Sequence, residues 1–413
     1  MSITRRALIG ASVVSALAPR PLTCAQAGAD SQMIRIGVLT DLSGNYRDAV
    51  GPTGVTCVRQ AVQEFTSGKD DMRIEVLAAD FQNKPDVGVA IARRWFDQDG
   101  VDMIVELVNS AVALAVSAVG REKNKVILVS GAATSELTGR QCSPNTIHWT
   151  YDTWMLAQST ATNTLRAGGD TWSIIAPDYA FGHQLSSDTS RFVEKAGGKV
   201  LRTAFYPFPD TTDFSAYLQQ AVASGAKVLG ICSGSGADSV NIIKQAREFG
   251  LHTRMRLASM LISLTVVHAL GLEVAQGLHL TETFYWDLND RTRSFTSRVR
   301  PKTPTNWPNM FQAGNYAATL HYLKAVSDLG ITAAKADGRA VVARMKKMPT
   351  DDDCFGQGYI REDGRKIHPS YLFQVKSPAE SKQEWDLYKL VATTPADQAF
   401  RPLTEGGCPL VHA

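Results

Sequence analysis

The feature that most constrains the fold is a repeated alternation of short apolar runs with longer segments of helical periodicity. The first series of β-rich runs comprises residues 34–39, 74–78, 103–105 and 126–129. The order restarts near residue 150, with runs at 172–176, 199–205, 228–232 and 255–259. Strands that alternate with helices form parallel sheets covered by helices on both faces. The pattern therefore predicts an α/β fold of two lobes, each with a doubly wound parallel sheet.

The last third of the chain departs from this alternation. Residues 281–309 are rich in aromatic residues, Pro and Asn, and a strong helical pattern follows at 311–329. Later runs alternate like antiparallel strands. We expect the chain to cross between the lobes near residues 151, 283 and 356. The predicted first lobe is 28–151 plus 284–356, and the predicted second lobe is 152–283 plus 357–413.

The N-terminal segment has the pattern of an export signal. Arg5 and Arg6 precede an apolar run at 7–18, which is too short to span a bilayer, and small residues lie at 25–27. We predict a signal peptide at 1–27. The Arg5-Arg6 pair favours the twin-arginine pathway, while ordinary Sec export stays open. A lipoprotein modified at Cys24 fits the preceding residues poorly.

Charge and composition limit the partners. Lys and Arg number 43 and Asp and Glu 40, so the three signal-peptide arginines account for the whole excess. A chain without net charge has no field that attracts nucleic acid. Hydrophobic residues make up 44% of the chain, which is enough for a large core. The composition predicts a globular protein that does not bind nucleic acid.

The cysteines predict one disulfide and several buried thiols. Beyond the signal peptide the cysteines are Cys57, Cys142, Cys232, Cys354 and Cys408. Cys354 and Cys408 both fall in the irregular final segment, so we predict a disulfide between them. Cys57 and Cys232 fall in a helix and a strand and are predicted to be buried thiols. No CxxC pair and no EF-hand spacing occurs, so we expect neither a metal nor a cofactor.

Several segments resemble the branched-chain amino acid binding family, the type I periplasmic binding proteins. They occur in order along the chain: IGVLTDLSGNY at 36–46, DFQNKP at 80–85, NS at 109–110, VILVSGAATSELT at 126–138, DYAFG at 178–182 and TDFS at 212–215. The resemblance implies two lobes joined by a hinge of three crossovers, with a ligand cleft between them. It also implies a monomer in the periplasm that delivers a small molecule to the membrane permease of an ABC transporter.

The candidate binding residues follow strands or match the family's cleft positions. Loops between a strand and a helix present free N–H groups that bind carboxylates, although helix capping or an ordinary turn also explains such residues. Aromatic rings supply apolar contact and a polar handle. The family often has an aromatic hydroxyl where this chain has Phe181. The predicted set is Tyr46, Asn109, Ser110, Ala132, Thr134, Tyr151, Phe181, Gly234, Met260 and Tyr285.

The class of ligand is predicted from the absence of an acidic side chain at one position of the cleft. Amino acid binders of this family bind the ammonium with an acid in the loop that corresponds here to 260–265, and this loop contains no Asp or Glu. A desolvated ammonium without an anionic partner is costly, so we expect a small organic carboxylate, with an aromatic acid favoured. Asp152 or Asp178 could instead supply the charge, which leaves a branched-chain amino acid or amide binder or sensor open. The other alternative is a hydrolase, but GxSxG and HExxH are absent and no enzyme is predicted.

Overall fold

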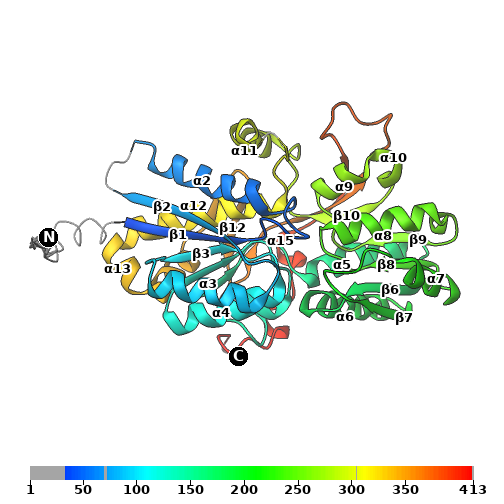
Figure 1. The fold of residues 1–413 in the computed structure, drawn as a ribbon, viewed down its shortest axis with the longest axis horizontal. Coiled ribbons are helices and arrows are strands. Elements are labelled where there is room, and N and C mark those ends of the chain that lie inside the picture. Colours follow the sequence, from blue (N-terminus) through cyan, green and yellow to red (C-terminus); the bar gives the residue numbers. More distant parts are fainter. Residues whose placement is uncertain (1–32, 69–71, 304, 412–413) are drawn as a thin grey trace, which may run out of the picture.

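The computed structural model describes residues 33–68, 72–303 and 305–411, so the predicted signal peptide lies outside the described residues. Within these ranges no helix is long and apolar enough to cross a membrane. The chain forms two α/β lobes side by side, as predicted (Figure 1).

The first lobe is built on a parallel sheet of strand order β2-β1-β3-β4-β5. Its strands are β1 (Met33–Thr40), β2 (Arg73–Asp80), β3 (Met103–Glu106), β4 (Val126–Val129) and β5 (Thr146–His148). Its helices are α2 (Gly51–Thr66), α3 (Pro85–Asp97), α4 (Ser110–Lys123), α11 (Asp290–Val299), α12 (Met310–Leu329), α13 (Ile331–Ala336) and α14 (Gly338–Lys347), with 3-10 turns η1 (Ser135–Thr138) and η3 (Arg300–Lys302). The α2 and α12 helices pack together on one face, and α3 packs with α4 on the other (Figure 1).

The second lobe repeats the architecture with strand order β7-β6-β8-β9, again parallel. Its strands are β6 (Thr171–Pro177), β7 (Lys199–Tyr206), β8 (Val228–Ile231) and β9 (Arg256–Ser259). Its helices are α5 (Thr153–Arg166), α6 (Ala180–Lys195), α7 (Ser215–Ala223), α8 (Ala237–Glu248), α9 (Leu264–Leu270) and α10 (Leu272–Ala275), with the turn η2 (Leu251–Thr253).

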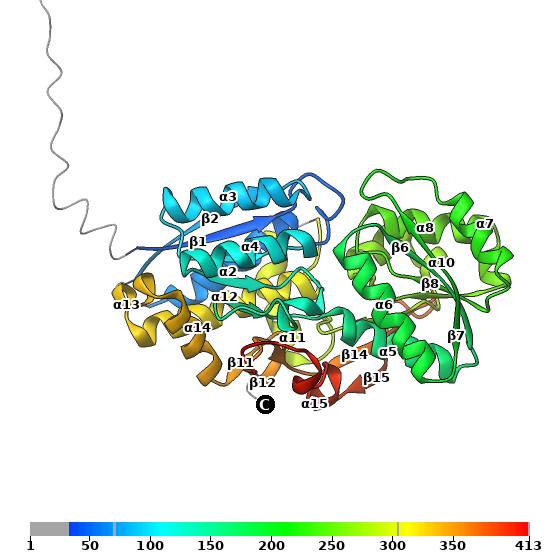
Figure 2. The same cartoon turned by 90° about the horizontal axis from the view of Figure 1, so that it is seen from below.

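The strand register places the candidate loops at one edge of each sheet. Leu39 pairs with Glu106, and Glu106 with Val129, so the loops after β1, β3 and β4 leave the sheet together. In the second lobe Ile231 pairs with Ser259 in the same way. Ligands of open parallel sheets bind at this carboxyl edge. Both carboxyl edges face the space between the lobes (Figure 2).

The chain passes between the lobes three times and then returns. It leaves the first lobe between β5 and α5 and re-enters it after β10 (His279–Glu282). The third passage lies between β13 (Lys366–Ile367) and β14 (Ser370–Val375). The β13 strand pairs with β12 (Gly356–Ile360), which in turn pairs with β11 (Thr350–Asp352). The β14 strand pairs with β10 and with β15 (Tyr388–Thr394). Of the last elements, α15 (Ala396–Ala399) contacts both α5 and β13. The segment that contains η4 (Leu403–Glu405) returns to the first lobe, where Cys408 is bonded to Cys142.

The predicted disulfide between Cys354 and Cys408 is wrong. Cys408 is bonded to Cys142 of the first lobe, with a Cα–Cα distance of 5.7 Å, and Cys354 is a buried free thiol. The prediction failed because it paired cysteines by their neighbouring positions in the irregular tail, whereas the fold brings the tail back to a loop 266 residues earlier. Cys57 and Cys232 are buried free thiols, as predicted.

The tail also differs from the predicted lobe boundaries. The sequence predicts 357–413 as part of the second lobe, but β12 and β13 continue the hairpin of β11, and His148 bridges to Arg365. Arg401 donates to the carbonyl of Ser135 in the first lobe. The segments 357–367 and 401–408 therefore lie against the first lobe, because strand pairing and a disulfide, neither visible in local periodicity, decide their position. The other boundaries stay a prediction.

Candidate functional site

A small cavity lies between the lobes, where their carboxyl edges meet. The first-lobe side, including its crossover, contributes Tyr46, Ala49, Val108, Tyr151 and Phe311 to the wall, and the second lobe contributes Tyr179, Phe181, Gly234, Ser235 and Leu261. Its volume is about 10 Å³, close to the space that one buried water needs. The two lobes are therefore closed on each other, and a larger ligand requires the wall to move apart.

Aromatic contacts across the cleft close the cavity. The hydroxyls of Tyr46 in the first lobe and Tyr179 in the second lie 2.7 Å apart and share a hydrogen bond. Phe208 stacks on both rings, with centroids at 5.6 Å from Tyr46 and 4.9 Å from Tyr179. Burial raises the pKa of both phenols, so both stay protonated and can donate. These rings are the part of the wall that must separate when the cleft opens.

Four of the predicted residues line this cavity: Tyr46, Tyr151, Phe181 and Gly234. The Tyr151 hydroxyl donates to the carbonyl of Gly131 at 2.6 Å, and its ring lies 5.2 Å from that of Phe311. Tyr151 is therefore fixed in the wall, while Phe181 belongs to the first turn of α6.

Four others lie behind the wall in a capping network. The Asn109 side chain accepts from the N–H groups of Ala111 and Val112 at the start of α4. The Ser110 hydroxyl accepts from the N–H of Thr134, and the Ala132 carbonyl bonds to His148. Asn109, Ser110, Ala132 and Thr134 thus hold the loops that follow β3 and β4. Their contact with a ligand stays a prediction.

Tyr285 and Met260 are not part of the cavity wall. The Tyr285 hydroxyl accepts from the N–H groups of Leu387 and Tyr388 and donates to the carbonyl of Trp385. Tyr285 therefore holds the start of β15 and the residues just before it, a contact about 100 residues away that the sequence alone could not predict. Met260 is fully buried, and the next residue, Leu261, lines the cavity instead.

Sequence reasoning missed several wall residues. Ala49, Val108, Leu261 and Phe311 are apolar and carry no signal that separates them from core residues. Tyr179 lies two residues before Phe181 and Ser235 follows Gly234, and the available signal was their polar hydroxyl groups beside these predicted residues. The Ser235 hydroxyl is buried and has no hydrogen-bond partner among the described residues, so it is a polar group that a ligand could satisfy.

The first turn of α6 adds backbone donors to the wall. Tyr179 precedes this helix and makes no side-chain capping bond, with extended backbone angles of φ −157° and ψ 177°. The first N–H groups of a helix have no partner within it, and the helix dipole favours an anion there. Because Tyr179 and Phe181 line the cavity, the uncapped turn can bind a carboxylate.

Among the described residues no charged side chain lines the cavity. Asp152 caps α5 and lies 3.7 Å from the buried Arg365, and Asp178 is exposed and 2.8 Å from His183. Glu106 is buried beside Val108, where its carboxyl accepts from Thr40 and Asn315. Burial raises the pKa of Glu106 to about 8, so this group is mostly protonated at pH 7. Asp152 and Asp178, the two acids that the sequence offered as alternative partners for a ligand ammonium, thus already have partners within the protein.

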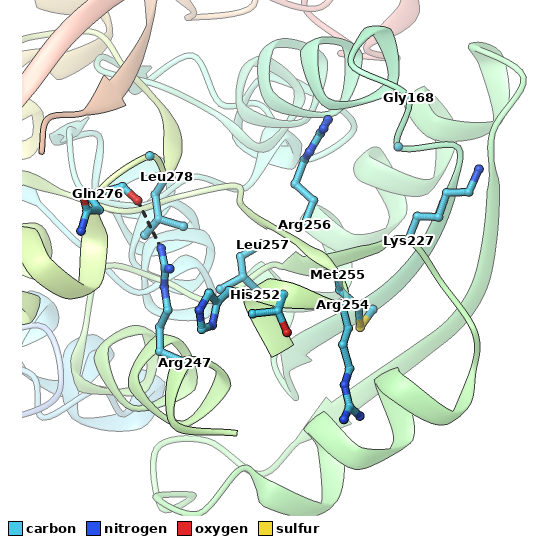
Figure 3. Close-up of a pocket in the computed structure, with 13 residues that line it drawn as sticks. Gly168, Lys227, Arg247, His252, Arg254, Met255, Arg256, Leu257, Gln276 and Leu278 are labelled. Atoms are coloured by element: carbon cyan, nitrogen blue, oxygen red, sulfur yellow. Dashed lines mark hydrogen bonds between the residues drawn. The ribbon is translucent and has the colours of Figure 1, made fainter. Parts of the chain in front are cut away.

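A larger cavity of about 520 Å³ lies at the opposite edge of the second sheet (Figure 3). It adjoins the starts of β8 and β9 and is lined by Lys227, Arg247, Arg254 and Arg256, among others. Lys227 pairs with Asp170, and Arg247 donates to the carbonyl of Gln276. The side chains of Arg254 and Arg256 point away from each other in Figure 3. This cavity has no part in the inter-lobe site.

No group of His, Cys, Asp and Glu able to hold a metal occurs in the described part of the chain. The Asp351–Asp353 segment makes ion pairs instead: Arg291 pairs with Asp351 and Asp353, and Arg298 pairs with Asp353. This aspartate run therefore serves the packing of α11 against the hairpin of β11.

The comparisons with known proteins agree with this architecture. A family model described as periplasmic binding protein matches residues 33–383. A periplasmic binding protein from Burkholderia mallei is 42% identical, with a TM-score of 0.87, over 92% of this chain and 99% of that chain. A branched chain amino acid ABC transporter periplasmic ligand-binding protein from Burkholderia xenovorans is 38% identical, with a TM-score of 0.79, over 91% and 99%.

The match to curated sequences is more distant. A Leu/Ile/Val-binding protein homolog from Brucella melitensis is 25% identical over 239 residues, or 58% of this chain. The aligned part spans 60% of the length of that relative.

Proposed function

The chain belongs to the periplasmic binding protein family, and from this premise we propose that it is an extracytoplasmic solute-binding protein of an ABC importer. Its lobes close on a small organic carboxylate, with an aromatic acid favoured, and a membrane permease receives the ligand. The observation that carries the proposal is the inter-lobe cavity, which combines aromatic walls, the uncapped first turn of α6 and no charged side chain among the described residues.

The wall suits an apolar acid better than a free amino acid. A carboxylate can accept from the first N–H groups of α6, and a ring can replace the contacts between Tyr46, Tyr179 and Phe181. An ammonium would enter a wall without an anionic partner, and burying an unpaired charge is costly. Transport of a free solute also fits export by the predicted signal peptide, a monomeric protein and a periplasmic location.

A branched-chain amino acid is the second candidate. The 38% identical protein from Burkholderia xenovorans is described as a branched chain amino acid transporter component. An amino acid would be accommodated if Glu106 lost its proton and moved toward the ligand, since its second carboxyl oxygen has no hydrogen-bond partner among the described residues.

A ligand panel tests the proposal. The protein is purified without refolding, native mass spectrometry identifies any co-purified ligand, and calorimetry compares benzoate-like and cinnamate-like acids with leucine, valine and small amides. We expect micromolar binding of at least one aromatic acid, recovered unchanged. Micromolar binding of leucine or valine, with no aromatic acid bound, would show that the ligand assignment is wrong, and a hydrolysed ligand would indicate an enzyme.

A backbone substitution tests the carboxylate position. Ala180→Pro removes the N–H at the first residue of α6, where Pro is tolerated and the extended Tyr179 is compatible with it. Loss of one hydrogen bond to a charged group should cost about 1.5–3 kcal/mol of binding. Asp290→Pro makes the same change at the first residue of α11, away from the cavity. Equal affinities of the two variants would contradict the assignment of the α6 turn.

A further inference from the structure

We propose that Asn45 latches the two lobes together and thereby sets the ligand affinity. Asn45 belongs to the loop after β1 in the first lobe, but both ends of its side-chain amide bond to α8 of the second lobe. Its Oδ1 accepts from the N–H of Ala237 at 3.0 Å, and its Nδ2 donates to Asp238 Oδ1 at 3.1 Å. This inference rests on the proposed function, because a latch acts only in a chain whose lobes open and close.

The α8 helix lacks a cap of its own. Gly236 occupies its N-cap position and has no side chain to accept from the first N–H groups. Asn is among the best capping residues, and here Asn45 supplies the cap from the other lobe. When the lobes separate, Ala237 loses its protein acceptor. The capping energy of α8 is thus available only in the closed state, so it favours closure.

The loop of the second lobe is shaped to receive Asn45. A Cβ atom at Gly236 would lie 2.1 Å from Asn45 Nδ2 and 2.8 Å from the Asn45 carbonyl oxygen. Only a residue without a side chain lets the two loops approach this closely. A groove of about 280 Å³, lined by both loops and by α9, opens beside the contact. The latch therefore lies at the rim of the cleft, where solvent can reach it as the lobes part.

The contact with Asp238 requires a hydrogen-bond donor at position 45. Asp238 is buried, and its other oxygen accepts from the Tyr206 hydroxyl at 2.7 Å. The titratable groups that face it are the phenols of Tyr46, Tyr179 and Tyr206. Asn45 presents one acceptor to Ala237 and one donor to Asp238, whereas an ionised Asp side chain only accepts and an Ala side chain does neither.

Two substitutions with a matched control test the latch. Asn45→Ala removes both bonds, and Asn45→Asp keeps the acceptor for Ala237 but sets a second carboxylate against Asp238. Asn289→Ala removes a cap of the same residue type from α11, within one lobe. Nitroxide labels at Gln98→Cys in the first lobe and Lys195→Cys in the second report the lobe separation. The distance between the two labels is measured at pH 5 and pH 8, with and without the tightest-binding compound of the ligand panel.

We expect Asn45→Ala to weaken binding about 5- to 10-fold, to lower the closed population at both pH values and to speed amide exchange at Ala237. Asn45→Asp should open the lobes at pH 8 and recover toward wild type at pH 5, where the two carboxyls can share a proton. Asn289→Ala should lower thermal stability and leave closure unchanged. The pH-dependent recovery is a readout that a general loss of stability would not produce.

The failures of the two proposals are distinguishable. If a panel compound binds and both Asn45 variants keep the wild-type affinity and closed population, the latch is refuted and the proposed function stands. If no panel compound binds, the proposed ligand class is wrong. The distance between the nitroxide labels and the amide exchange at Ala237, both measured without ligand, still test the latch. A wild-type chain with no closed population in either condition refutes the latch and lobe closure together.

Discussion

The close approach of Tyr46 to Gly234 predicts that Gly234→Ala weakens ligand binding without destabilising the fold. A Cβ atom at Gly234 would lie 2.7 Å from a ring carbon and from the hydroxyl of Tyr46. Carbon atoms pack best at about 3.5–4.0 Å, so the lobes or the ring must shift by about 1 Å. The ring has little freedom, because it is bonded to Tyr179 and stacked on Phe208.

The magnitude follows from the cost of overpacking. Extra atoms in a packed site cost about 1–3 kcal/mol, which corresponds to roughly 5- to 150-fold in affinity. Gly234 and Tyr46 belong to different lobes, so the clash exists only when the cleft is closed. The free energy of unfolding should therefore stay near the wild-type value. Gly234 is outside the positive-φ glycines, so Ala adds no backbone strain there.

Calorimetry with the best panel ligand and urea unfolding measure the two effects. Gly230→Ala is the matched control, because its Cβ would lie 2.9 Å from Trp172 of the same lobe. This control should lose stability and keep its affinity. Unchanged affinity in Gly234→Ala, or a loss of stability equal to that of the control, would refute the reasoning.

Two further predictions concern stability. Cys408→Ser should lower the thermal midpoint and leave ligand affinity unchanged, since closing a loop between residues 266 apart stabilises by about 5.5 kcal/mol in the chain-entropy model and often less in practice. Peptide mapping that pairs Cys408 with Cys354 would contradict this prediction. Glu106→Gln should flatten the pH dependence of stability. Burial raises the pKa of Glu106 to about 8, so the contribution of this group to stability is complete below the ordinary carboxyl pKa and is lost as the pH rises through 8. Thermal midpoints that fall equally steeply from pH 5 to 9 in the wild type and the variant would contradict this prediction. Burial also raises the pKa of Glu282 to about 8, so part of the pH dependence should remain in the variant.

Much of the architecture follows from local sequence. The alternation of apolar runs and helical patterns predicted both parallel sheets, because strand and helix periodicities are properties of neighbouring residues. The same patterns placed the candidate loops after strands, and the carboxyl edge of a parallel sheet then brought Tyr46, Tyr151, Phe181 and Gly234 to one cavity. A strand end fixes the position of the loop that follows it, and the resemblance to the family's cleft positions singled out Tyr46, Tyr151 and Phe181 among the aromatic residues of these loops.

Only the tertiary structure decided which distant segments meet. The partner of Cys408 lies 266 residues away, and no local pattern distinguishes Cys142 from Cys354 as that partner. Tyr285 has the same aromatic character as Tyr46, but strand pairing buries it against β15 instead of the cleft. From the sequence, Asn45 is indistinguishable from an ordinary turn residue, and its hydrogen bonds to α8 exist only because the lobes close. Such contacts depend on how whole lobes pack, a property that the residues beside each position do not encode.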